Sequence, residues 1–209
     1  MGSARRTLCV TAAVFALLIG PAEARQSPQD LADRAEMDLA QGRLSEAVAG
    51  FDRLAALVPD VAPLLWQRGV ALYELRQFDA CAAQFASYFK VNPDDAENVA
   101  WHFLCVARGQ SIAKARAALL PVGNDPRVLR AQIAEMLRGT RTPAELVLLT
   151  RGTVAVARFY AHLYAGLYEE AAGNRDRAVE YLTIAASDEL RGEGGLMNDV
   201  ARLHLSRMK

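Results

Sequence analysis

A pattern of small and aromatic residues recurs in this chain at an offset of 34 positions. The segment "DLAQGRLSEAVAGF", residues 38–51, aligns with "LYELRQFDACAAQF", residues 72–85, and each segment ends in phenylalanine. The match continues from "VPD" at 58–60 to "NPD" at 92–94. A period of this length is typical of stacked helical hairpins, because one hairpin cannot bury its apolar face without a copy of itself beside it.

A helix–turn–helix unit of 34 residues resembles the tetratricopeptide repeat, or TPR. The segments that we assign are two repeats at 28–61 and 62–95, a degraded unit at 96–121, irregular helices at 122–152, a TPR-like pair at 153–187 and a capping helix at 195–208. We therefore expect an all-α fold, a right-handed TPR-type α-solenoid of about eleven helices. It forms one domain over 25–209, and its last helix covers the open end of the stack.

Single positions agree with the TPR pattern. Ala35 and Gly69 stand at the eighth position, where the first helix of a unit needs a small residue. Cys81 stands at the twentieth position, where the second helix crosses the first closely. Asp38 and Arg68 depart from the pattern, because the family prefers an aromatic residue and a leucine there. The register predicts that Cys81 is buried.

Residues 1–24 have the organisation of a secretory signal. Arginines near the start precede an apolar stretch from Leu8 to Ile19, and Ala22-Glu23-Ala24 supplies a cleavage site. The stretch is too short to span a bilayer comfortably, and an uncleaved anchor is the less favoured alternative. We expect a mature chain that starts near Arg25, works in the periplasm or as a secreted protein, and has no stable membrane span.

The composition limits the classes of partner and the use of cysteine. Lys and Arg number 24, as do Asp and Glu, so the formal net charge is zero. This balance argues against nucleic acid, since phosphate binding needs a basic surface. Cys81 and Cys105 are the two cysteines that follow the signal. They are too few for a disulfide scaffold, and we favour buried free thiols over a single bond between them.

The sequence contains no motif that assembles a catalytic site. The three histidines lie far apart, and no metal-binding, phosphate-binding or nucleophile motif is found. His162 precedes Glu169 and Glu170 by about two helical turns, but packing of His162 within a helix interface is favoured over a metal or acid–base site. We expect no catalytic residue, no metal and no cofactor. A small-molecule or metal-dependent enzyme built on a helical stack is the alternative.

Aromatic residues of the helices are the best candidates for binding a partner, because large aromatic side chains in a concavity anchor partners well. Trp66 and Tyr73 occupy positions that face the concave groove in TPR proteins, but burial of both rings in the core is about equally favoured. Tyr160, Tyr164 and Tyr168 form a helical stripe that is read as an internal interface, with a binding wall as the alternative. The partner-binding candidates are Trp66, Gln67, Val70, Tyr73, Trp101 and Arg108.

The mature chain resembles the NlpI-like group of bacterial envelope TPR proteins. The segments that carry the resemblance are "WQRGVALYELRQFDACAAQF", "NPDDAENVAWHFL" and "FYAHLYAGLYEEAAGNRDRAVEYL". The resemblance implies an adaptor that docks proteases or wall hydrolases in the cell envelope, although this chain lacks a lipid-attachment cysteine at the cleavage site. We expect a non-enzymatic scaffold that holds a protein or peptide partner on its concave face. Homodimer formation stays open.

Overall fold

The computed structural model describes residues 27–208 apart from 124 and 126, and every regular element in this part of the chain is a helix. The predicted all-α class is confirmed, while the predicted signal at 1–24 lies outside the described residues. None of the described helices is long and apolar enough to cross a membrane. The α-helices are α1 (Pro28–Ala40), α2 (Leu44–Leu57), α3 (Trp66–Glu74), α4 (Phe78–Val91), α5 (Ala96–Gly109), α6 (Ile112–Ala117), α7 (Val128–Arg138), α8 (Pro143–Leu148), α9 (Ala155–Ala171), α10 (Arg175–Ala185) and α11 (Leu196–Met208), and the 3-10 helices are η1 (Pro59–Leu64) and η2 (Asp188–Leu190).

Helix boundaries follow from local sequence. The Ser27 side chain accepts a hydrogen bond from the Asp30 N–H, and the Asp30 carboxylate accepts one from the Ser27 N–H, so α1 begins with a capping box. Thr142 and Glu145 form the same arrangement at the start of α8. Helix α2 ends two residues before Pro59, which has no N–H with which to continue it.

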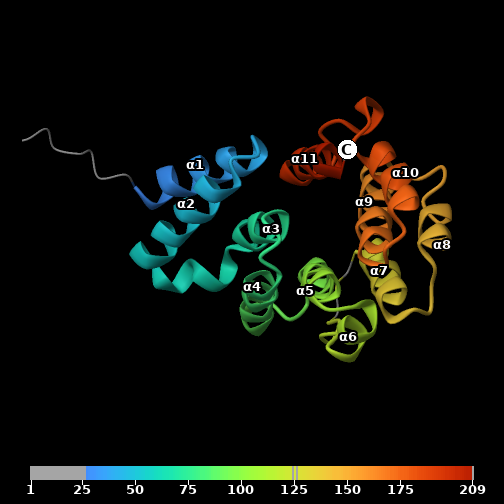
Figure 1. Ribbon diagram of the computed structural model, residues 1–209, viewed down its shortest axis with the longest axis horizontal. Coiled ribbons are helices and arrows are strands. Elements are labelled where there is room, and N and C mark those ends of the chain that lie inside the picture. The colour runs from blue at the N-terminus through green and yellow to red at the C-terminus, as the bar shows by residue number, and fades with distance from the viewer. Residues whose placement is uncertain (1–26, 124, 126, 209) are drawn as a thin grey trace, which may run out of the picture.

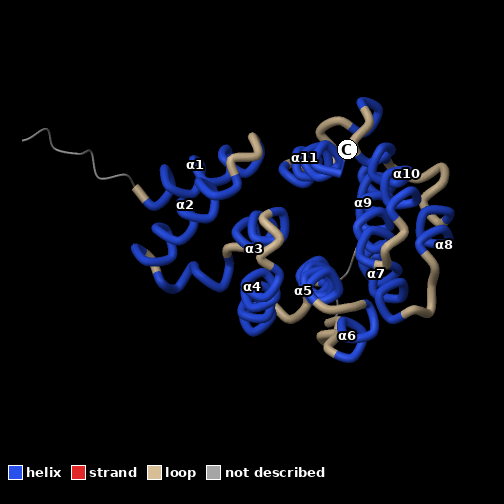
Figure 2. Tube along the Cα trace, in the orientation of Figure 1, coloured by secondary structure: helices blue, strands red, loops and turns tan. Residues whose placement is uncertain are grey.

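Successive helices pack as hairpins around an arc (Figures 1 and 2). Helix α1 pairs with α2, α3 with α4, and α9 with α10. A small residue lets the two helices of a pair approach closely. A Cβ atom at Gly69 of α3 would lie 2.5 Å from the Phe85 ring, and one at Gly166 of α9 would lie 2.6 Å from Leu182 Cγ. The close contact with the next helix therefore explains why the eighth position requires a small residue.

Substituting Gly69 by alanine should lower the free energy of unfolding by about 1 to 3 kcal/mol, because the new methyl group would overlap the buried Phe85 ring. Alanine is the better helix former by about 1 kcal/mol, so helix propensity alone predicts the opposite sign. Urea denaturation measures the change. Ala83→Gly, at an exposed position of α4, reports the propensity effect by itself. A stabilised Gly69→Ala protein would contradict the close approach of α3 and α4.

Helix α11, for which the sequence predicts an end cap, contacts both the last and the first hairpin. It lies in the opening of the arc, between α1 and α10, and it packs against both (Figure 1). Leu203 of α11 reaches the turn between α1 and α2, where a Cβ atom at Gly42 would lie 2.9 Å from Leu203 Cδ1. The last helix therefore joins the two ends of the arc. His204, a polar residue of α11, forms hydrogen bonds with side chains of α3 and α9, as described below.

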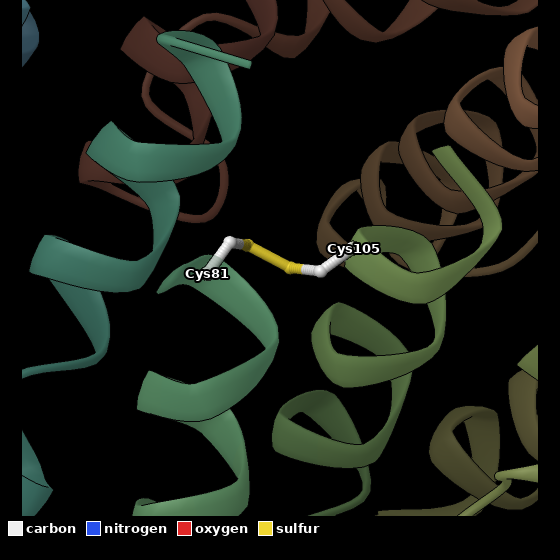
Figure 3. The surroundings of a disulfide bond; sticks show 2 residues. All are labelled: Cys81 and Cys105. Atoms are coloured by element: carbon white, nitrogen blue, oxygen red, sulfur yellow. A yellow bond between two sulfur atoms is a disulfide. The ribbon is translucent and has the colours of Figure 1, made fainter. Parts of the chain in front are cut away.

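Cys81 of α4 and Cys105 of α5 form a disulfide (Figure 3). Their Cα atoms are 5.8 Å apart, within the usual range for a disulfide, and both residues are fully buried. The prediction that Cys81 is buried is confirmed, and the expectation of two free thiols is wrong. The reason is that the packing of α4 on α5 brings the two buried positions face to face, which a separate reading of each position does not reveal.

Candidate functional site

The six partner-binding candidates lie in different surroundings, some in the core or in internal contacts and others at the wall of a cavity. Val70 is fully buried, and Tyr73 is 2% exposed with its ring 5.2 Å from the Trp101 ring. Both belong to the core. For Tyr73, the sequence left open whether its ring faces the groove or the core, and the structure places it in the core. Gln67 donates a hydrogen bond from Nε2 to Glu36 Oε1 at 2.5 Å, so its amide is engaged in the contact between α3 and α1.

Arg108 is not available to a partner carboxylate. Its guanidinium pairs with Glu170 of α9 and lies 5.5 Å from the centroid of the Phe78 ring. Only 14% of the Arg108 side chain is exposed. This candidate residue instead forms an internal ion pair that links α5 to α9.

His204 of α11 lies between two carboxylates. Its Nδ1 is 2.7 Å from Glu74 Oε1 of α3, and its Nε2 is 2.8 Å from Glu170 Oε2 of α9. Burial alone would lower the His204 pKa, but the Glu74 charge and the hydrogen bond with Glu170 raise this pKa to about 9. At neutral pH the imidazolium donates from both nitrogens and has no lone pair for a proton or a metal. We call this group the Glu–His–Glu clamp, since it joins α3, α9 and α11.

His162 does not meet the glutamates that the sequence places two turns away. Its Nδ1 lies 2.7 Å from the Arg158 carbonyl oxygen of the same helix, and its ring packs near Tyr181. Glu169 instead pairs with Arg177 at 3.4 Å. Among the described residues, no group of three or more His, Cys, Asp or Glu side chains is arranged to hold a metal ion.

Trp66 and Trp101 line one cavity, which has a volume of about 270 Å³ and lies between α3, α4, α5, α9 and the start of α11. The Phe85 and Trp101 rings are stacked with centroids 6.0 Å apart, and both residues are buried. Trp66, Tyr88 and Tyr160 are partly exposed, so they form the accessible part of the wall. We call this cavity the aromatic pocket.

The charged groups beside the aromatic pocket are already paired. Asp95 and Glu97 belong to its wall, and Arg127 lies 2.8 Å from the first and 3.2 Å from the second. Glu97 also pairs with Arg130 and accepts a hydrogen bond from the Tyr164 hydroxyl at 3.0 Å. Burial raises the Glu97 pKa, although the Arg130 charge opposes the rise. Among the described residues of this wall, the pocket therefore offers a ligand neither a free carboxylate nor a free guanidinium.

Asn98 is a buried polar residue of the pocket wall whose side chain has no hydrogen-bond partner among the described residues. It lies in the first turn of α5 and is 3% exposed. Neither Oδ1 nor Nδ2 of its amide, both buried, has a hydrogen-bond partner within the described part of the chain. A buried amide without partners costs on the order of 1 to 3 kcal/mol, so it is a feature that needs a reason.

Comparisons with known proteins do not assign this geometry to a family. No protein-family model matches the chain, and a search of curated proteins finds no match. The TPR assignment and the resemblance to the NlpI-like group therefore stay predictions from the sequence.

Proposed function

We propose that this protein is a non-enzymatic scaffold of the TPR type that binds a peptide segment of another protein. The observation that carries the proposal is the convergence of Trp66 and Trp101, from successive units, on one aromatic pocket. Aromatic side chains that are partly buried and partly accessible anchor partners efficiently, because they offer a large apolar area at a low cost in conformational entropy.

The size of the aromatic pocket favours a peptide anchor. Sites for whole drug-sized ligands commonly occupy about 300 to 1,000 Å³, whereas this cavity holds about 270 Å³. One large apolar side chain with the adjoining main chain fills such a space. The pocket is lined by residues of α3, α4, α5, α9 and the start of α11, so a bound segment would be in contact with several helices at once.

The disulfide supports a location outside the cytoplasm. Disulfides persist in oxidising compartments and are rare in the cytosol, and Cys81–Cys105 is buried between two helices rather than exposed as a reactive pair. This agrees with the predicted secretory signal. We propose that the protein acts as an adaptor of the cell envelope.

An enzyme is less well supported. His204 of the Glu–His–Glu clamp is the described histidine whose pKa is shifted most, but carboxylates engage both of its ring nitrogens. An imidazolium fixed in this way stabilises the packing of helices and has no free nitrogen to serve as a general base.

The pocket can be tested with a displayed library of random peptides. Peptides selected on the protein should bind Trp66→Ala about thirtyfold more weakly, a loss of about 2 kcal/mol, because Trp66 supplies accessible wall of the pocket. Leu57→Ala is the matched control, since Leu57 is an exposed apolar residue of α2 outside the pocket. Calorimetric titration measures both affinities. Equal binding by the two variants would contradict the proposed site.

A further inference from the structure

We infer that the aromatic pocket recognises an uncharged stretch of peptide main chain together with the apolar side chain that it carries, and that the Asn98 amide hydrogen-bonds that main chain. This inference rests on the proposed peptide-binding function and names the chemistry of the ligand. Three features of the described structure support it, namely the unpartnered amide, the paired charges and the aromatic wall.

The Asn98 amide supplies one acceptor, Oδ1, and a donor group, Nδ2, and neither has a partner within the described residues. The N–H and C=O of one residue in an extended chain lie on the same side, as they do in an antiparallel sheet. A single carboxamide can therefore accept from that N–H and donate to that C=O. Because both polar atoms of Asn98 are buried in the wall of the pocket, its amide must turn toward the cavity in order to meet such a ligand.

The paired charges argue against a charged ligand. A cation would have to compete with Arg127 and Arg130 for Asp95 and Glu97, and Arg130 already lies 4.0 Å from the centroid of the Tyr160 ring. An anion would face the two carboxylates of the wall. A neutral ligand meets neither obstacle, and its apolar side chain can pack on the Trp66, Trp101 and Phe85 rings.

The chain offers a built-in reporter for this test. It has two tryptophans, and both line the aromatic pocket. A ligand that enters the pocket must change the environment of at least one indole ring, so the intrinsic tryptophan emission follows occupancy of this site without any label.

Four small probes that share a benzyl side chain separate the ligand classes. They are N-acetylphenylalanine N-methylamide, its ester analogue in which oxygen replaces the phenylalanine N–H, N-acetylphenylalanine with a free carboxylate, and phenylalanine N-methylamide with a free ammonium. Titration of the full chain should show the first probe binding about tenfold more tightly than its ester analogue, because the ester leaves Asn98 Oδ1 without a donor. Both charged probes should bind more weakly than the first.

A substitution of similar size isolates Asn98. Asn98→Leu removes the unpartnered amide, so its melting temperature should equal or exceed that of the unaltered protein, while the preference for amide over ester disappears. A lower melting temperature, with the preference for amide over ester retained, would show that Asn98 stabilises the fold and does not bind the ligand. That result would overturn the inference.

The outcomes for the two proposals can be told apart. Equal binding of the amide and ester probes, or tightest binding of a charged probe, overturns the inference about ligand chemistry and leaves the peptide-binding function standing. No change in tryptophan emission with any of the four probes overturns the pocket as a binding site, and both proposals fail with it.

Discussion

Replacing His204 by alanine should lower the free energy of unfolding by about 3 kcal/mol or more. The substitution removes the charge that sits between Glu74 and Glu170, and Glu74 is almost completely buried. Breaking a buried ion pair from one side commonly costs about 3 to 5 kcal/mol, because the remaining charge stays desolvated. Since α11 joins the two ends of the arc, the loss should be global. Urea denaturation monitored by circular dichroism measures it.

The same clamp predicts a dependence of stability on pH. The His204 pKa is raised from 6.5 to about 9, so its contribution is fully present below pH 6.5 and is lost as the pH rises through about 9. Burial alone would raise the Glu170 pKa, but His204 and Arg108 outweigh it and lower this pKa from 4.5 to about 2. Its contribution is therefore present above pH 4.5 and is lost as the pH falls through about 2.

Matched variants assign this pH dependence to the clamp. His204→Gln should flatten the decline in stability between pH 6.5 and 9. His162→Gln should leave that decline unchanged, because burial lowers the His162 pKa and its own titration falls below pH 6.5. Arg191→Ala, which removes an exposed ion pair with Asp188, should leave the free energy of unfolding almost unchanged, because solvent screens the two charges. A decline that persists in His204→Gln would show that other groups titrate in this range.

Reducing the Cys81–Cys105 disulfide should destabilise the protein by about 3 kcal/mol. The bond links positions 24 residues apart, and the chain-entropy model assigns about this value to a loop of that length. Both sulfur atoms belong to buried residues, so reduction should require partial opening of the α4–α5 contact and should be slow under native conditions.

A double variant supplies the control for the disulfide. Cys81→Ala combined with Cys105→Ala should match the reduced protein in stability, and it should not respond to dithiothreitol. The protein with its disulfide should lose about 3 kcal/mol in the same reductant. Identical denaturation curves with and without reductant would show that the bond does not form or does not constrain the unfolded chain.

Much of the helical layout follows from the sequence, because the repeat fixes which positions are buried. Phe51, Phe85 and Cys81 are all buried in the structure, and α2 and α4 end before Pro59 and Pro93 as proline chemistry requires. The position of α11 does not follow from the sequence. Its apolar residues indicate that the helix packs against others, but they do not indicate which helices those are. Its position depends on contacts with α1, α3, α9 and α10.

The candidate site was only partly predictable. The sequence indicates Trp66 and Trp101 as candidates because large aromatic residues in a concavity anchor partners well, and both line the aromatic pocket. The same argument indicates Tyr73, but this residue lies in the core, because α5 and α11 bring Trp101 and His204 against its ring. Asn98 carries no signal in the sequence. A single asparagine in the first turn of a helix has no distinctive pattern, and its lack of partners is visible only in three dimensions.

The most direct test of the peptide-binding account locates a bound peptide on the protein. A peptide selected from the library is synthesised with benzoylphenylalanine at its apolar anchor, irradiated in the complex, and the attachment point is identified by mass spectrometry. The account predicts attachment to the wall of the aromatic pocket, at residues such as Trp66, Tyr88 or Met197. Attachment confined to a second cavity, which residues of α8, α9 and α10 such as Leu148 and Ile184 line, would contradict it.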